Sequence, residues 1–234
     1  MQDKFSYYDF IANIIPGILI LWGLNFASMT SRLLQKATTN NIATDTLTFI
    51  VLAYILGLAI QFLAKNSIEI LLKHIFWKDT FFSELYLIKE ANLCFESTRE
   101  KILEYATNKF GYSKKQLNVL NTKNIFANKT KLNLAMGLSQ QIYRSLDAYT
   151  SDNSLAQKAH LQNIKYSMFR GISLAFFVLS IIILLENIVG LGLAMKYFIL
   201  PCIFFIGFLL FFIITKQRGE LYIKGLFNTI FYKD

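Results

Sequence analysis

The chain has 234 residues, of which 54% are hydrophobic and only 17% charged, and its 24 Lys and Arg against 15 Asp and Glu give a formal net charge of +9. Average soluble domains are about a quarter charged and the mean hydropathy here is positive, so the composition disfavours a soluble protein and favours a membrane protein. The two histidines and two cysteines show no zinc-ligand spacing, and we expect no metal site and no cofactor.

The first apolar segment, residues 11–30, is predicted to be a transmembrane helix. It is interrupted by Asn13, by Asn25 and by the adjacent Pro16 and Gly17. The apolar run is longer than the core of a signal peptide, which has about 7–15 residues, and no small-x-small cleavage site follows it. We therefore expect this helix to be retained.

The second predicted span, residues 46–64, contains no charged residue. Its 19 residues, at about 1.5 Å each, are enough to cross a hydrocarbon core of about 30 Å. Apolar residues keep helical spacing beyond Lys65, which predicts that the helix continues as a stalk. Residues 1–64 would thus form an N-terminal pair of transmembrane helices.

A polar insert, residues 65–169, follows. It contains 15 Lys and Arg and nine Asp and Glu, and a polar block of this size is not expected in hydrocarbon. Residues 79–105 are acidic and amphipathic, residues 108–131 are basic and loop-rich, and residues 132–149 return to helical periodicity. We predict a helical domain outside the bilayer, inserted between the second and third spans.

The basic segment, residues 108–131, is the best candidate for a ligand site. It has no acidic residue, and its cations are Lys109, Lys114, Lys115, Lys123, Lys129 and Lys131. The interleaved Phe110, Tyr112 and Phe126 suit base stacking beside phosphate contacts, which predicts a nucleotide or oligonucleotide ligand. Two alternatives stay open. The segment is also suited to anionic lipid headgroups, or to pairing with the preceding acidic segment, which contains Glu84, Glu90, Glu96, Glu100 and Glu104.

The second pair of spans is predicted within residues 170–216. An uninterrupted helical pattern runs from residue 154 into an apolar stretch that Glu186 and Asn187 are expected to end. Residues 197–215 form the fourth predicted span, and residues 217–234 are interpreted as a basic, aromatic tail. Four spans place both termini and the insert on one side, which would hold 21 of the 24 Lys and Arg. The positive-inside rule makes that side cytoplasmic.

Polar or helix-bending residues in the spans are the candidates for a pore or gate: Asn13, Pro16, Gly17, Asn25 and Glu186. Polar groups in lipid turn toward partners or water, and a Pro-Gly pair kinks a helix. Simple packing is the alternative for Pro16, Gly17 and Asn25, and a cap at the end of the third span is the alternative for Glu186. No P-loop, GxSxG, HExxH or dinucleotide motif is present, and we expect no enzyme.

The opening Phe5-Ser6-Tyr7-Tyr8-Asp9-Phe10, followed by Pro16-Gly17, resembles small bacterial inner-membrane proteins of anti-phage systems. The passage from Leu161 to Gly171, with Tyr166 four residues before Arg170, is similar to the start of their third span. The resemblance is to membrane effectors of the Hailong type, in which a membrane channel is restrained by the product of a nucleotidyltransferase. It implies a bacterial inner-membrane location and a nucleotide-signalling partner enzyme.

The resulting hypothesis is an all-α, oligomeric, pore-forming effector embedded in the lipid bilayer, with a ligand or soluble partner acting on the cytoplasmic domain. Copies arranged in a ring would form a conduction path from one helix each. The alternative is a membrane scaffold that recruits a soluble partner and conducts nothing. A transporter is a third option, disfavoured because paired broken helices are not apparent.

Overall fold

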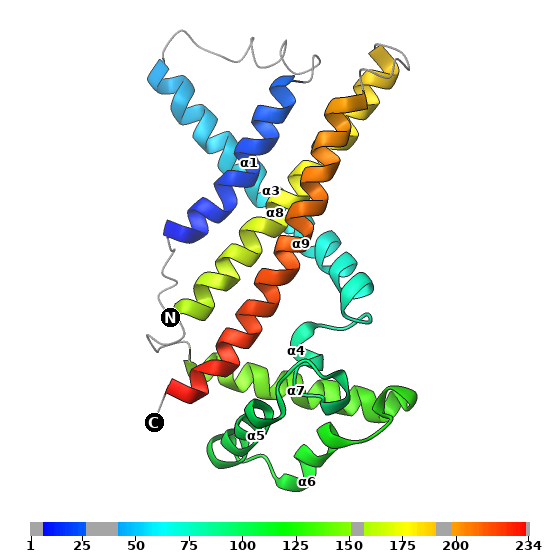
Figure 1. The fold of residues 1–234 in the computed structure, drawn as a ribbon. Coiled ribbons are helices and arrows are strands. Elements are labelled where there is room, and N and C mark those ends of the chain that lie inside the picture. The colour runs from blue at the N-terminus through cyan, green and yellow to red at the C-terminus, as the bar shows by residue number, and fades with distance from the viewer. Residues whose placement is uncertain (1–6, 27–41, 151–156, 191–197, 233–234) are drawn as a thin grey trace. The chain divides into compact units, whose positions relative to one another are not determined.

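The computed structural model describes residues 7–26, 42–150, 157–190 and 198–232, and every regular element in these ranges is helical (Figure 1). The all-α prediction is confirmed for this part of the chain. The chain divides into two compact units. The apolar unit comprises Met1–Ile70 and Asn163–Arg218, and the polar unit comprises Leu71–Gln162 and Gly219–Asp234.

Four helices contribute to the apolar unit: α1 (Tyr7–Phe26), α3 (Ile42–Phe76), α8 (Gln157–Gly190) and α9 (Ile199–Asn228). Among the described residues, three helical segments are long and apolar enough to cross a membrane: Thr46–Phe76, Lys158–Ile188 and Ile199–Phe231. The apolar part of α1, Phe10–Leu24, is shorter, so the fourth span stays a prediction.

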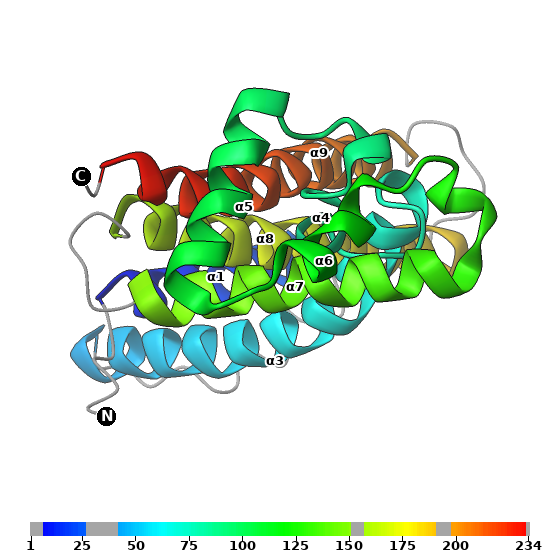
Figure 2. The same cartoon turned by 90° about the horizontal axis from the view of Figure 1, so that it is seen from below.

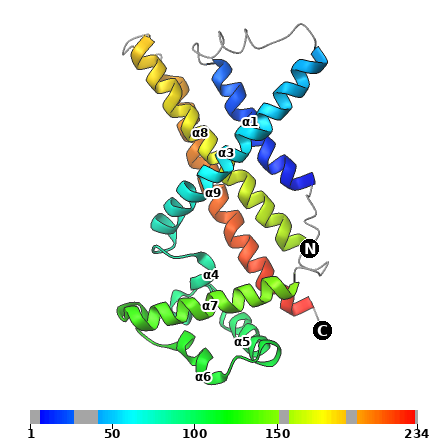
Figure 3. The same ribbon diagram turned by 180° about the vertical axis from the view of Figure 1, so that it is seen from behind.

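Helices α1 and α3 cross at very close range (Figure 3). A Cβ added to Gly17 would lie 1.7 Å from the Ala53 carbonyl oxygen, and one added to Gly57 would lie 1.8 Å from the Asn13 carbonyl oxygen. Gly17 and Gly57 are therefore required because they let the two backbones touch, which is how small residues pack apolar helices in lipid.

Helices α8 and α9 pack through phenylalanines. Phe176 stacks on Phe211 with ring centroids 5.3 Å apart, and Phe177 lies 5.1 Å from Phe208. Buried hydroxyls bond to backbone carbonyls of the other helix: Ser173 Oγ donates to Phe208 O (3.3 Å) and Ser180 Oγ to Pro201 O (2.9 Å). Much of the phenylalanine content of the sequence thus serves this helix pair.

The polar unit is built around α7 (Lys129–Thr150), as Figure 2 shows. Short elements precede it: α4 (Phe82–Leu85), η1 (Lys89–Ala91), α5 (Glu96–Phe110), α6 (Lys114–Leu117), η2 (Asn118–Asn121) and η3 (Ile125–Ala127). Helix α7 contacts α4, η2 and η3. The fully buried apolar side chains include Leu87, Ile88, Ile102, Leu120, Ile125, Ile142 and Leu146.

Most of the segment interpreted as a C-terminal tail belongs to the polar unit, and some of its side chains lie in the core. Helix α9 continues to Asn228 and is followed by η6 (Thr229–Tyr232). Leu226 and Phe227 are fully buried, and the Phe227 ring stacks on Tyr86 with centroids 5.0 Å apart. Apolar residues at helical spacing within 217–234 produce this burial, a pattern that the aromatic and basic composition masked.

The other helix predictions have mixed outcomes. The second span does continue past Lys65, since α3 runs to Phe76, and α8 passes through Gly171 without a break. The prediction that Glu186 and Asn187 end the third span is wrong, because both lie inside α8, which continues to Gly190. A pair of polar side chains does not end a helix, because the backbone groups of both residues can still form the helical hydrogen bonds.

Candidate functional site

The six lysines of the basic segment lie on several short elements, and all of them are exposed. Lys109 is in the last turn of α5, Lys114 and Lys115 open α6, and Lys123 lies in the turn between η2 and η3. Lys129 and Lys131 lie in the first turn of α7. The cations are therefore distributed around the loops that join α5 to α7.

Local chemistry explains why the chain turns so often here. Gly111, at φ 74°, ends α5 in the left-handed conformation that glycine adopts without strain. Ser113 starts α6 with a capping box, in which its hydroxyl accepts the Gln116 N–H and the Gln116 carboxamide oxygen accepts the Ser113 N–H. The Asn128 side-chain oxygen accepts the Lys131 N–H at 3.1 Å at the start of α7.

The aromatic residues of the basic segment are engaged in internal contacts. Phe110 lies between Tyr105 and Tyr149, with centroids 5.8 and 5.9 Å away. The Tyr112 hydroxyl lies 3.4 Å from Ser145 Oγ, and the Phe126 ring lies under the Lys78 ammonium group at 4.1 Å. The expectation that these rings stand ready to stack on bases is thus not supported by their placement.

The acidic segment does not neutralise the basic one. Glu96 pairs with Lys89 and Arg99, Glu84 caps α4 by accepting the Phe81 N–H, and Glu90 accepts the Ile125 N–H. Within the described residues, no ion pair joins a carboxylate to any lysine of the basic segment. The two segments thus meet through a hydrogen bond to one backbone N–H, and ion pairs between them are not formed by the described residues.

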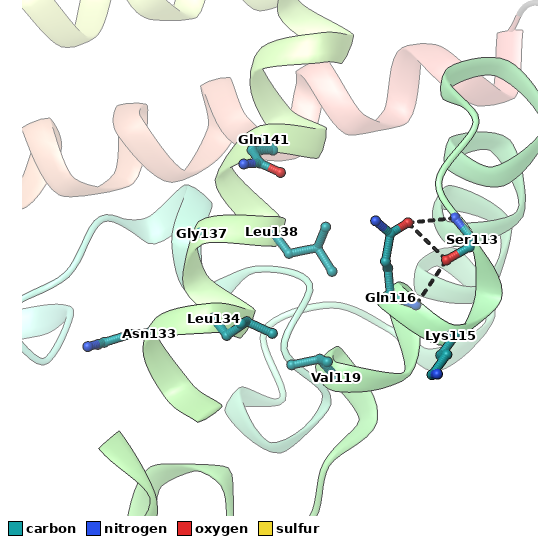
Figure 4. A pocket seen from close by; sticks show the side chains of 9 residues that line it. All are labelled: Ser113, Lys115, Gln116, Val119, Asn133, Leu134, Gly137, Leu138 and Gln141. Atoms are coloured by element: carbon teal, nitrogen blue, oxygen red, sulfur yellow. Dashed lines mark hydrogen bonds between the residues drawn. The ribbon is translucent and has the colours of Figure 1, made fainter. Parts of the chain in front are cut away.

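Two open grooves flank α6, and one lysine of the basic segment lines each of them. The larger, about 850 Å³, lies between α6–η2 and α7 and includes Lys115 (Figure 4). The smaller, about 380 Å³, lies beside α5 and includes Lys114. The other four lysines line neither of these two grooves.

In the apolar unit, Gln61 is the centre of a buried polar contact between three helices. Its Nε2 atom donates to Ala12 O in α1 (3.0 Å) and to Ser167 O in α8 (2.9 Å). Pro16 has no N–H, so it cannot form the helical bond to the carbonyl four residues earlier, and that carbonyl belongs to Ala12. Gln61 therefore replaces the hydrogen bond that Pro16 removes from α1.

This contact assigns packing roles to two of the pore or gate candidates. Pro16 and Gly17 are both buried. A Cβ on Gly171 of α8 would lie 2.6 Å from Gln61 Nε2 and 2.8 Å from Pro16 Cγ, so Gly171 leaves room for both side chains. Within one chain, the Pro-Gly pair joins α1 to its neighbours.

The other two candidates with described side chains, Asn13 and Glu186, lie on different helices. Asn13 is half-buried and its backbone oxygen lies beside Gly57. Glu186 is half-buried near the end of α8. The side chain of Asn25 lies outside the described residues.

An ion pair that the sequence did not reveal joins α3 to α8. The Arg170 guanidinium donates to Glu69, and both side chains are largely buried. The Arg170 guanidinium also lies over the Tyr166 ring, 5.4 Å from its centroid. The sequence predicted a helical stalk beyond Lys65 but no partner for Glu69, because charge spacing within one helix says nothing about pairing across two.

In the polar unit, the surroundings of Cys94 and Glu96 shift the pKa values of both side chains. Burial raises the pKa of the Cys94 thiol, while the neighbouring Tyr86 hydroxyl and Arg99 act in the opposite direction. The hydrogen bond from Lys89 lowers the pKa of the Glu96 carboxyl. Among the described residues, no three His, Cys, Asp or Glu side chains lie close enough together to hold a metal ion. These shifts follow from packing and one surface ion pair.

No protein-family model, curated protein or solved structure matches this chain. The resemblance to anti-phage membrane effectors therefore stays a prediction.

Proposed function

We propose that this protein is an oligomeric, pore-forming membrane effector whose polar unit receives the gating signal. The observation that carries the proposal is the continuity of α3, α8 and α9. Each contributes residues to both units, and none is interrupted at residues 70, 162 or 218, where one unit passes into the other. A ligand that prefers one state of the polar unit can then bias the helices of the apolar unit.

The side chains of the apolar helices support assembly with lipid or with further copies. From Thr46 to Leu63, the exposed residues of α3 are apolar except for Thr46 and Thr48, and the exposed residues of α9 from Ile199 to Ile213 are all apolar. A path enclosed by such faces would be a hydrophobic constriction, which gates by losing and regaining water.

The gating signal is proposed to be a nucleotide-type ligand or a soluble partner acting on the basic segment, whose lysines are exposed. The setting proposed is the bacterial inner membrane in anti-phage defence, with four spans and with both termini and the polar unit in the cytoplasm. The positive-inside count and the resemblance support these statements.

The test is induced expression in bacteria that report membrane potential with a voltage-sensitive dye. We expect depolarisation within minutes of membrane insertion. The matched control is Gly17→Leu, which abolishes the α1–α3 crossing and should insert but not conduct. A wild-type protein that reaches the membrane and leaves the potential unchanged would refute the pore.

A membrane scaffold that conducts nothing is the second candidate. One observation favours it: Gln61, Ser173 and Ser180 are buried inside the apolar unit rather than on its surface. From residue 50 to 63 of α3 and from Ile199 to Ile213 of α9, the exposed residues form no polar stripe that would line an aqueous path. Cross-linking in native membranes separates the candidates, since a ring of four or more copies supports the pore and a monomer supports the scaffold.

A further inference from the structure

The groove between α6–η2 and α7 has an apolar floor and a polar rim. Val119, Leu134 and Leu138 form the floor, and Leu134 is 59% exposed. Lys115 and Gln141 belong to the rim, with Gln141 on α7 one turn beyond the leucines (Figure 4). An exposed leucine in the lining of a groove about 850 Å³ in volume is a surface that a partner's apolar side chains can cover.

Gly137 lies in the same groove, and no described residue packs against the position of its missing Cβ. It is in the interior of α7, a helix of 22 residues, where glycine is disfavoured relative to alanine. A Cβ added to it would meet nothing within 4 Å, in contrast to Gly17 and Gly57, whose positions are filled by a neighbouring backbone. The missing Cβ leaves the α7 backbone open to close approach by another helix.

One lysine lines this groove and a second lies near it on α7. Lys115 lines the groove, and Lys131 precedes Leu134 by three residues on α7, which places both on one helical face. Both lysines are exposed, and neither forms an ion pair with a described carboxylate. An acidic partner would meet cations with no competing intramolecular ion pair there.

The lining favours a protein over a nucleotide. None of the described residues that line the groove is aromatic, and Phe110, Tyr112 and Phe126 are engaged elsewhere. Base stacking, one of the two main contributions to binding of single-stranded nucleic acid, therefore has no platform here. Apolar side chains at helical spacing and a glycine between them are instead the features that receive an amphipathic helix.

We propose that this groove binds an acidic amphipathic helix of a soluble partner protein. Apolar residues of that helix, three or four positions apart, would cover Val119, Leu134 and Leu138, and its backbone would pass close to Gly137. Its carboxylates would lie beside Lys115 and Lys131. The inference rests on the proposed function in one respect, that the polar unit receives a soluble partner.

The experiment pans a displayed library of random 18-residue peptides on the full-length protein in lipid nanodiscs. We expect the enriched peptides to be acidic, with apolar residues at helical spacing. Binding should fall at least tenfold on Lys115→Glu and on Gly137→Leu, and Gly137→Ala, which keeps the helix intact, should weaken it by a smaller factor. Lys158→Glu, the same charge change on an exposed lysine of α8, should leave affinity unchanged.

Three outcomes would overturn the proposal: no enrichment, enriched peptides that are neutral or basic, or acidic peptides whose affinity survives Gly137→Leu. Binding of a labelled oligo-dT probe is measured in parallel. If the wild-type protein binds this probe and the Lys115→Glu and Gly137→Leu variants do not, the groove is assigned to nucleic acid instead. The depolarisation assay is independent of the panning. Depolarisation without peptide binding refutes the groove alone, and peptide binding without depolarisation refutes the pore alone.

Discussion

The hydrogen bond from Gln61 to Ala12 should be energetically coupled to Pro16. In Gln61→Leu the side chain keeps roughly its size but no longer donates to Ala12 O or to Ser167 O. The Ala12 carbonyl then has neither a side-chain donor nor an N–H from Pro16, and a buried unsatisfied polar group costs about 1–3 kcal/mol. Hydrogen bonds between helices in membranes average about 0.6 kcal/mol and reach about 1.7. We therefore expect Gln61→Leu to destabilise the protein by about 1–2 kcal/mol.

The same substitution should cost less when Pro16 is first replaced by alanine. The new backbone N–H can donate to the Ala12 carbonyl, so in the Pro16→Ala background Gln61→Leu loses only its two contacts with Ser167, the bond to Ser167 O and the one from Ser167 Oγ. The coupling free energy between Gln61 and Pro16 should be about 1 kcal/mol. It is measured by a double-mutant cycle, with unfolding of the reconstituted protein followed as denaturing detergent is increased.

Ser180→Ala supplies the matched control for this cycle. Ser180 is buried and donates to Pro201 O, but it lies 13 residues beyond Ser167 on α8, about 20 Å along the helix. Its effect should add to that of Gln61→Leu within about 0.5 kcal/mol. If Gln61→Leu costs the same with and without Pro16, Gln61 does not replace the missing bond, and the packing argument for the Pro-Gly pair fails.

Three further predictions concern single positions. Gly17→Ala should lower stability in the same detergent titration, because its Cβ would collide with a backbone carbonyl of α3. Gly137→Ala should raise stability by about 1 kcal/mol, because its Cβ meets open space. Equal effects of the two substitutions would contradict the backbone crossing. Glu69→Leu should destabilise the protein on the order of 3 kcal/mol, because Arg170 is then buried without its partner. The double variant Glu69→Leu with Arg170→Met should recover most of that loss. A double variant as unstable as the single one would argue against a buried pair. Burial raises the pKa of Cys94, so its alkylation at pH 8, followed by mass spectrometry, should be several-fold slower than that of an unstructured peptide thiol. Since the folded pKa is the higher one, this thiol's contribution to stability is complete below its unfolded pKa and is lost as pH rises through the folded one. An alkylation rate equal to the peptide's would contradict the raised pKa of this half-buried thiol.

Composition and periodicity were sufficient to predict the helical class and the long helices. Uninterrupted apolar spacing predicted that α3 runs past Lys65 and that α8 passes Gly171, since both depend on local hydrogen bonds and on the face that each helix buries. The same reasoning placed the exposed lysines in a loop-rich segment, because glycine and asparagine mark turns by their own conformational preferences.

Contacts between distant segments could not be predicted in this way. Nothing local to residue 61 indicates that its amide serves a carbonyl 49 positions earlier, and nothing local to Glu69 indicates its partner on α8. Phe227 was assigned to a tail because its partner, Tyr86, lies more than a hundred residues away in the chain. The sequence determined which segments are helical and which faces are apolar, since these depend on neighbours within a few turns. The tertiary structure decided which polar groups are paired and which remain exposed, because pairing depends on which helices meet.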